Sequence, residues 1–200
     1  TYNSYIQSYM DSHEDYIQQL EDELAALDVL MPESPAAIVA TTVSHQHLYG
    51  LTFRLFRPFC YQQAFTARLS QYAEDLIALV EQHSSFGLVS SPSHLGRMNR
   101  LQDWHLVQPK CSEVFSSTAP LSLDNSLNVA GLLQAPVTEI YGSSETGALA
   151  WRRQQSDDES SLWQPLAHVE LSKANDGSLN VLFCHDATQV NLADQVEFSP

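Results

Sequence analysis

The sequence has 200 residues, of which 44% are hydrophobic and 10% aromatic. This is long and apolar enough to bury a core, as one domain or as part of a larger one. The net charge of -15 argues against binding to nucleic acids or to anionic membrane surfaces, because both need clustered Lys and Arg.

The cysteine pattern favours free thiols. Cys60, Cys111 and Cys184 are far apart, and no pair has C-x-x-C spacing. A disulfide framework or a zinc site is therefore not expected. No apolar run reaches the length of a membrane span and no signal peptide is visible, so we expect a cytoplasmic protein.

The first 35 residues are expected to form an acidic N-terminal helical segment. Leu20, Leu24 and Leu27 recur at helical spacing with acidic residues on the other faces, which predicts a helix over residues 14–27. The prolines that follow end this segment.

A buried strand is expected next. Residues 36–43 form a continuous apolar and β-branched run, the length of a strand covered on both faces. The loop that follows carries His45 and His47. A His pair two positions apart, without a nearby acid or Cys, is poor spacing for a metal site, so the simpler interpretation is a polar loop.

Residues 51–59 are predicted to form a helix whose apolar face carries Leu51, Leu55, Phe56 and Phe59. We expect Arg54 and Arg57 on its outer face. A second helix is predicted over residues 72–82, with acidic residues in its first turn.

The middle of the chain alternates strands and helices. Residues 85–89 predict a strand, and Pro92 begins a helix expected to include Leu95, Met98 and Leu101. A strand at 113–115 leads into the small-residue loop Ser117, Thr118, Ala119, Pro120, and a helix is expected over 123–133. Small residues in this loop let a planar group lie against the backbone, and the alternative is a plain proline turn.

Residues 137–153 combine a short β-branched strand with a Gly/Ser turn and a second apolar run. Tyr141, Ser143, Ser144 and Glu145 gather chemical groups in and around the turn at Gly142. An aromatic ring can stack on a base, hydroxyls can donate to phosphate oxygens, and a carboxylate can hold a hard cation such as Mg²⁺. Such turns expose these groups at the carboxyl end of a sheet.

The last part of the chain is predicted to be rich in β-strands. Residues 154–161 form a polar acidic loop, and Asn175-Asp176-Gly177 is a hairpin signal between two strands. The fold class expected is α/β, a layered sheet flanked by helices with a small β unit near the C-terminus. We expect a core at 36–153 and a β-rich end of the same domain at 154–200.

Tyr141-Gly142-Ser143-Ser144-Glu145 resembles the Y-G-x-[ST]-E motif of the adenylate-forming (ANL) superfamily. That superfamily contains acyl-CoA and acyl-ACP synthetases, the adenylation domains of peptide synthetases, and luciferases. Residues 43–51 are similar to its apolar-P-x-x-H-x-x-G-apolar pattern, with His47 and Gly50 in the matching places and Ser44 in place of proline.

Two further stretches resemble this superfamily in the same order. Residues 116–121 are similar to S-G-[GA]-[AE]-P-L, which faces the adenine ring, although Ser117 and Thr118 replace residues that are often Gly or Ala. Residues 191–198 are similar to x-x-x-G-D-x-[AV]-x-[FW], with Ala193 in place of glycine and Asp194 at the aspartate. Within the superfamily, the S-H-Q-H-x-Y-G-L form looks like acyl or aryl-acyl ligases of aryl-polyene and fatty-acid-like pathways.

The resemblance implies an AMP-forming acid–thiol ligase, in which a fatty or aryl carboxylic acid reacts with ATP to give an acyl-adenylate. The thiol of CoA, or the phosphopantetheine of an acyl carrier protein, then displaces AMP. It implies that Glu145 holds Mg²⁺, Ser144 contacts phosphate or the acyl oxygen, and Tyr141 lies on the adenine face. Asp194 would bind ribose, and His47 would lie beside the acyl pocket. Gly142, Ser143 and residues 117–120 would bind the nucleotide.

The sequence also departs from the superfamily. No glycine occurs before Gly50, where the Gly-rich phosphate loop with its Lys should be, and no lid domain with a catalytic lysine follows Asp194. We therefore expect a fragment of a larger ligase that is largely inactive in isolation.

Two alternatives stay open. The first is a non-catalytic domain with the same fold. The second is a serine hydrolase using Ser144 in a sequence close to G-x-S-x-G, although Thr146 takes the last position.

Overall fold

The computed structural model describes residues 17–30, 36–98, 104–154, 162–195 and 197. They belong to two compact units. The sheet unit comprises residues 31–164, and the hairpin unit comprises residues 1–30 and 165–200. The domain boundaries expected from the sequence stay a prediction.

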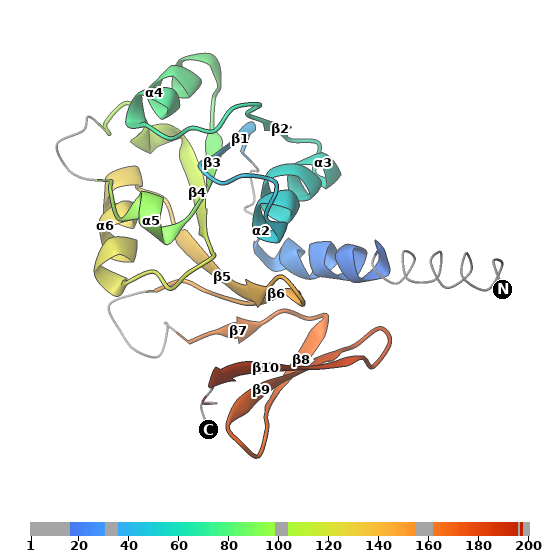
Figure 1. Ribbon diagram of the computed structural model, residues 1–200. Helices are drawn as coiled ribbons and strands as arrows, with labels where there is room; N and C mark the ends of the chain where they lie inside the picture. The colour runs from blue at the N-terminus through green and yellow to red at the C-terminus, as the bar shows by residue number, and fades with distance from the viewer. Residues whose placement is uncertain (1–16, 31–35, 99–103, 155–161, 196, 198–200) are drawn as a thin grey trace. The chain divides into compact units, whose positions relative to one another are not determined.

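A seven-stranded sheet forms the centre of the sheet unit, in the order β2-β1-β3-β4-β5-β6-β7 (Figure 1). The strands from β2 to β5 pair in parallel, and β6 returns antiparallel to β5. Their bounds are β1 Ile38–Thr41, β2 Ala64–Phe65, β3 Phe86–Ser90, β4 Cys111–Ser116, β5 Val137–Ser143, β6 Gly147–Arg152 and β7 Gln164–Pro165. The residues of β1 and β3 are buried throughout, which explains their continuous apolar runs.

Helices α4 (Ala73–Gln82) and α6 (Leu123–Leu133) pack their apolar sides on one face of this sheet. The cluster there includes Leu76, Leu88, Val114 and Val129. Capping fixes where both helices begin: Asp75 accepts from the Tyr72 N–H, and Ser122 accepts from the Asn125 N–H. The sequence prediction for both helices is confirmed to within one residue.

The helix predicted from Pro92 is shorter than expected. Helix α5 covers only Pro92–Leu95 and ends in a turn at Gly96 and Arg97. Gly96 favours such an ending because glycine loses more backbone conformational entropy in a helix than any other residue does. The expected continuation to Leu101 lies outside the described residues.

The other face of the sheet carries a continuous helical segment over residues 48–60, formed by α2 (Leu48–Gly50), the π-helix η2 (Leu51–Phe56) and α3 (Arg57–Cys60). The Arg57 N–H donates to the Thr52 carbonyl, five residues back. This wider turn shifts the faces of the helix relative to an α-helical pattern.

The expected faces of this helix were therefore wrong. Arg54 and Arg57 are 6% and 0% exposed, whereas Phe59 is 79% exposed. Phe53 packs against the sheet instead, with its ring centroid 5.0 Å from that of Phe115 on β4.

The hairpin unit contains a helix over residues 17–26, a 3₁₀ turn η1 (Leu27–Leu30) and a three-stranded antiparallel sheet. The strands are β8 (Val169–Lys173), β9 (Ser178–Phe183) and β10 (Gln189–Gln195). The predicted turn between β8 and β9 is confirmed, with Gly177 at a φ of 89°. Residues 14–16 of the predicted first helix lie outside the described residues.

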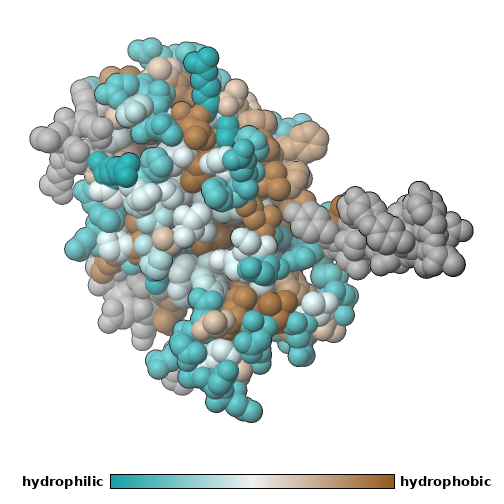
Figure 2. Space-filling model, viewed as in Figure 1, coloured by the Kyte–Doolittle hydropathy of each residue, from teal (hydrophilic) through white to brown (hydrophobic). Residues whose placement is uncertain are grey.

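The predicted fold class, an α/β sheet with helices and a small β unit, is confirmed. Hydrophilic residues cover much of the face drawn in Figure 2, as the acidic composition suggests. In the part of the chain that the structure describes, no helix is long and apolar enough to cross a membrane.

Candidate adenylate site

The candidate site lies where parallel strands β1, β3 and β4 end. In such sheets the carboxyl ends of neighbouring strands lie at one edge, and ligands bind outside that edge. Thr42 follows β1 and Ser90 ends β3, and their hydroxyl oxygens lie 2.8 Å apart. Ser117 follows β4 and donates its hydroxyl to the Ile140 carbonyl of β5. Side-chain hydrogen bonds thus join β1 to β3 and β4 to β5 at this edge.

A cavity of about 450 Å³ opens beside His47, and we call it the first cavity. His47 and Thr118, which come from two separate motif stretches, both line it. Val43, Tyr49 and Ser91 add walls from the ends of β1 and β3 and from the helix. The structure therefore brings together two of the residues singled out from sequence, in a space of the size that small-molecule sites take.

Gly50 allows the loop that carries His47 to pack against the helix. A Cβ at this position would lie 2.0 Å from the Ser44 carbonyl oxygen, closer than any side chain could approach. The glycine in the motif therefore serves contact between helix and loop.

Arg54 ties this loop to another wall of the site. Its guanidinium donates to the carbonyls of Thr66 and Ala67 at 3.2 and 2.9 Å, and lies 3.4 Å from Nδ1 of His45. The sequence pattern placed Arg54 outside, so this positioning role was missed. Its partners are 9 to 13 residues away, and periodicity carries no signal of them.

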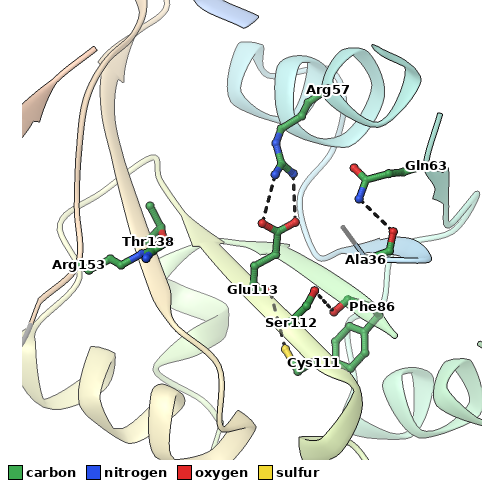
Figure 3. Close-up of polar contacts among 9 residues, drawn as sticks. All are labelled: Ala36, Arg57, Gln63, Phe86, Cys111, Ser112, Glu113, Thr138 and Arg153. Atoms are coloured by element: carbon green, nitrogen blue, oxygen red, sulfur yellow. Dashed lines mark hydrogen bonds and ion pairs between the residues drawn. The ribbon is translucent and has the colours of Figure 1, made fainter. Parts of the chain in front are cut away.

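Arg57 makes a buried ion pair below the site. Its guanidinium contacts both carboxylate oxygens of Glu113 on β4, each at 3.2 Å (Figure 3). It also lies 4.7 Å from the ring centroid of Phe115. Opposite Glu113, Gly87 on β3 leaves room, because a Cβ there would lie 3.0 Å from the carboxylate. This pair fastens helix 48–60 to the sheet.

The turn between β5 and β6 carries the Y-G-S-S-E residues. The strand continues to Ser143, so the expected turn at Gly142–Ser144 lies further along, at Ser144–Thr146. Gly142 packs tightly here, because a Cβ would lie 2.0 Å from the Gly147 carbonyl oxygen. Its role is close pairing in the hairpin.

The two serines of this turn have different roles. The Ser143 hydroxyl accepts from the Glu145 N–H and lies 3.0 Å from the Thr146 hydroxyl, so it stabilises the turn. Ser144 and Glu145 are exposed. The Ser143 hydroxyl, followed by the backbone of Glu145 itself, lowers the pKa of the Glu145 carboxyl, which is therefore ionised at neutral pH.

An exposed carboxylate of this kind fits a magnesium site shared with substrate phosphates, which typically uses one or two protein carboxylates. Among the described residues there is no group of three or more His, Cys, Asp or Glu side chains that could hold a metal by itself. Glu145 is thus suited to a cation that arrives with its phosphates.

Tyr141 is half-buried beside Trp163, with ring centroids 5.7 Å apart. The guanidinium of Arg152 lies 4.4 Å from the other ring, that of Trp163. Aromatic and cation–π contacts of this kind orient rings without covering both faces. Neither Trp163 nor Arg152 was singled out from the sequence.

The loop at residues 117–120 is anchored by a buried network. Glu139 on β5 accepts from the Leu121 N–H at 3.2 Å and pairs with Arg152 at 3.0 Å. Gln154 donates to the Leu121 carbonyl and to Glu139. A glutamate inside a β-branched run signals a buried charge that needs partners, and that signal was available in the sequence.

Thr118 has a backbone φ of 81°, in the left-handed region. A β-branched residue rarely adopts this conformation, whereas glycine does so freely. The motif S-G-[GA]-[AE]-P-L, which this loop resembles, has Gly or Ala at the position of Thr118. Threonine at this position strains the backbone of the loop, and its side chain takes up space beside it. Thr118, Ala119 and Pro120 are exposed, which leaves their backbone open to a planar ligand.

A second cavity of about 340 Å³ lies under α4 and α5. Its inner wall consists of apolar side chains from four segments of the sheet unit: Ala73, Leu76, Leu88, Met98 and Trp104. Gln71, His94 and Arg97 also line it. Partial burial, and then the charge of Arg97, lower the pKa of His94, so this imidazole is neutral at neutral pH. Nothing in the sequence pattern predicted this cavity.

Asp194 lies exposed on β10, in the hairpin unit. Its expected contact with ribose stays a prediction. Phe198, the last residue of the resembling stretch, lies outside the described residues.

No protein-family model and no curated protein sequence matches this chain. Solved structures do match. An acyl-CoA synthetase (AMP-forming)/AMP-acid ligase II-like protein from Dyadobacter fermentans matches with a TM-score of 0.69 and 18% identity, over 90% of this chain and 51% of that one. A malonyl-CoA ligase solved with methylmalonyl-CoA and AMP matches with a TM-score of 0.65 and 19% identity, over 82% and 38%.

A benzoate CoA ligase from Burkholderia xenovorans matches with a TM-score of 0.60 and 13% identity, over 76% of this chain and 35% of that one. The chain therefore spans between about a third and a half of the length of these ligases. The chain therefore shares the fold of part of these solved structures.

Proposed function

We propose that this chain is part of an AMP-forming acid–thiol ligase. It would activate a fatty or aryl carboxylic acid with ATP and pass the acyl group to CoA or to an acyl carrier protein. The observation that carries this proposal is the first cavity, where His47 and Thr118 meet at the carboxyl edge of the sheet. Two motif stretches about 70 residues apart thus meet at the edge where open α/β sheets bind their ligands.

The proposed roles follow from exposure and charge. Glu145, ionised and exposed, would hold Mg²⁺, which when bound neutralises charge on the phosphates. Ser144, whose neighbour Ser143 is used by the turn, would donate to phosphate or to the acyl oxygen. Tyr141 and the loop at 117–120 would hold adenine, and Asp194 would accept from both ribose hydroxyls.

His47 is exposed and lines the first cavity. In this proposal that cavity would hold the acyl group. The acid carboxylate would displace pyrophosphate from the α-phosphate of ATP, and the thiol would then displace AMP. An aryl-polyene pathway is the finer proposal, and it rests on the S-H-Q-H-x-Y-G-L form of the loop.

The structure argues against one of the two alternatives and is compatible with the other. A serine hydrolase needs its nucleophile on a turn between a strand and a helix, but Ser144 lies between antiparallel strands β5 and β6. A non-catalytic domain of the same fold is favoured by one observation, the strained Thr118 in the nucleotide loop.

Calorimetric titration with a non-hydrolysable acyl-adenylate mimic tests the proposal. Because the chain spans only about a third to a half of the ligases it resembles, binding is a better readout than turnover. We expect Asp194→Ala to weaken binding by about tenfold or more, since it removes hydrogen bonds to a charged acceptor. Glu170→Ala, another exposed acid of the same sheet, is the matched control. No binding by the unmodified chain would contradict the proposal and favour the non-catalytic alternative.

A further inference from the structure

The two cavities at the strand ends adjoin each other. Thr42 lines both of them. In two other segments, neighbouring residues line one cavity each: Leu69 the first and Ser70 the second, and Ser91 the first and Ser90 the second. The boundary between the cavities is therefore formed by residues 42, 69–70 and 90–91, most of which have small hydroxyl side chains.

An apolar group can pass these boundary residues at little cost in free energy. The hydroxyls of Thr42 and Ser90 are bonded to each other, and that of Ser91 lies 3.2 Å from Nδ1 of His94. Hydroxyls that already have partners lose little when water leaves their surroundings. The Ser70 N–H is likewise bonded to the Thr41 carbonyl.

The second cavity reaches into the hydrophobic core. Ala73, Leu76, Leu88 and Trp104 line it, and all four are core residues with at most 6% exposure. Protein cores are packed with few voids larger than a water molecule. The cavity is partly open, and the polar residues Gln71, His94 and Arg97 form part of its lining, so water can enter it. An apolar group bound against the inner wall would leave water for an apolar surface, which favours binding.

Aromatic side chains close the first cavity on the side of helix 48–60. Tyr49 lines the first cavity, and its ring centroid lies 5.0 Å from that of Phe53, which lies 5.0 Å from that of Phe115. Beyond them lies the buried pair of Arg57 with Glu113. An extended group in the first cavity therefore does not continue between helix 48–60 and the sheet, whereas the second cavity begins at Thr42.

We propose that the second cavity binds the far end of the acyl group, so that the acid activated here has an apolar tail of medium length. This rests on the proposed function, because the carboxyl end is placed beside His47. The tail would pass Thr42 and end against Leu76, Leu88 and Met98. Acids of two or three carbons would not reach this apolar wall.

A series of acyl-sulfamoyl-adenosine mimics tests the proposal by calorimetry on the full chain. Acetyl, butanoyl, hexanoyl and octanoyl mimics share the nucleotide and differ only in the tail. We expect affinity to rise by up to about fourfold for each added methylene beyond butanoyl, which is the transfer free energy of a buried methylene.

Variants that fill the second cavity locate the tail. Met98→Trp adds bulk at a partly buried wall position, and Ala73→Leu adds it where α4 begins. Both are expected to abolish the gain from butanoyl to octanoyl and to keep acetyl binding, which also shows that they fold. Leu127→Trp, at an exposed site on α6, is the control and should leave the whole series unchanged.

The outcomes separate the two proposals. If no mimic binds, the proposed function fails, and the tail site fails with it. If acetyl and octanoyl mimics bind equally well, or if both filling variants keep the octanoyl gain, the nucleotide site stands and the tail site is overturned.

Discussion

The buried pair of Arg57 and Glu113 gives the sharpest prediction about stability. Their side chains are 1% and 5% exposed, and two hydrogen bonds of 3.2 Å join them. Glu113→Ala would leave the guanidinium of Arg57 buried beneath the helix without its carboxylate. Removing one partner of a buried ion pair costs about 3–5 kcal/mol, against about 5–15 kcal/mol for the whole stability of a domain.

Urea unfolding followed by tryptophan fluorescence measures this cost. All three tryptophans, Trp104, Trp151 and Trp163, lie in the sheet unit, so the signal reports on that unit alone. With a slope of about 2 kcal/mol per molar urea, we expect the midpoint to fall by about 2 M. Glu81→Ala, an exposed acid on α4, should change the free energy of unfolding by less than about 0.5 kcal/mol.

The double variant Arg57→Met with Glu113→Leu distinguishes the charge from the packing. Replacing both partners by apolar side chains removes the desolvation cost together with the attraction, so we expect most of the lost stability to return. A single variant that costs less than about 1 kcal/mol, as exposed pairs do, would refute the reasoning, and so would a double variant as unstable as the single one.

Three further predictions concern single positions. Gly50→Ala should lower the free energy of unfolding by about 1–3 kcal/mol, because its Cβ would clash with the Ser44 carbonyl. Gly131→Ala should raise the free energy of unfolding by about 0.5–1 kcal/mol, because a Cβ at this position inside α6 would have nothing within 4 Å. Urea unfolding compares the two variants. Thr118→Gly should raise the free energy of unfolding by about 1 kcal/mol, because it relieves a φ of 81°, and an unchanged midpoint would argue against strain. Burial raises the pKa of the Cys111 thiol to about 12. Iodoacetamide at pH 8 should therefore label only Cys60 and Cys184 in the native chain, which mass spectrometry measures. A rapid third adduct would contradict this prediction.

Much of the fold could be predicted because local patterns determine it. The continuous apolar runs gave β1 and β3 to within two residues, and capping with helical periodicity gave α4 and α6. These elements are regular, so residues a few positions apart carry the necessary information.

Helix 48–60 shows where this reasoning fails. A six-residue π-helix changes which side chains share a face, so a pattern interpreted with α-helical spacing put Arg54 and Arg57 outside. The partner of Arg57 lies 56 residues away on β4, and no local pattern can indicate it. Buried charges of this kind follow from tertiary pairing alone.

The candidate site was only partly visible for the same reason. Motif spacing singled out His47 and Thr118, which the fold brings to one cavity. Glu139, Arg152 and Gln154 were not singled out, because they act through their contact with the loop at 117–120. The second cavity draws its walls from separate segments, so only the assembled sheet reveals it.

The hydrogen-bond network around Glu139 maintains the strained backbone conformation of Thr118. A β-branched residue in the left-handed region costs about 1–3 kcal/mol and persists only where its surroundings fix the backbone. Here Ser117 is bonded to the Ile140 carbonyl before Thr118, and Leu121 is bonded to Glu139 and Gln154 after it. With both ends held to β5 and its neighbours, the loop cannot relax by a local rotation. The strained residue is the one that lines the first cavity, so the network of Glu139 fixes the shape of that wall before any ligand arrives.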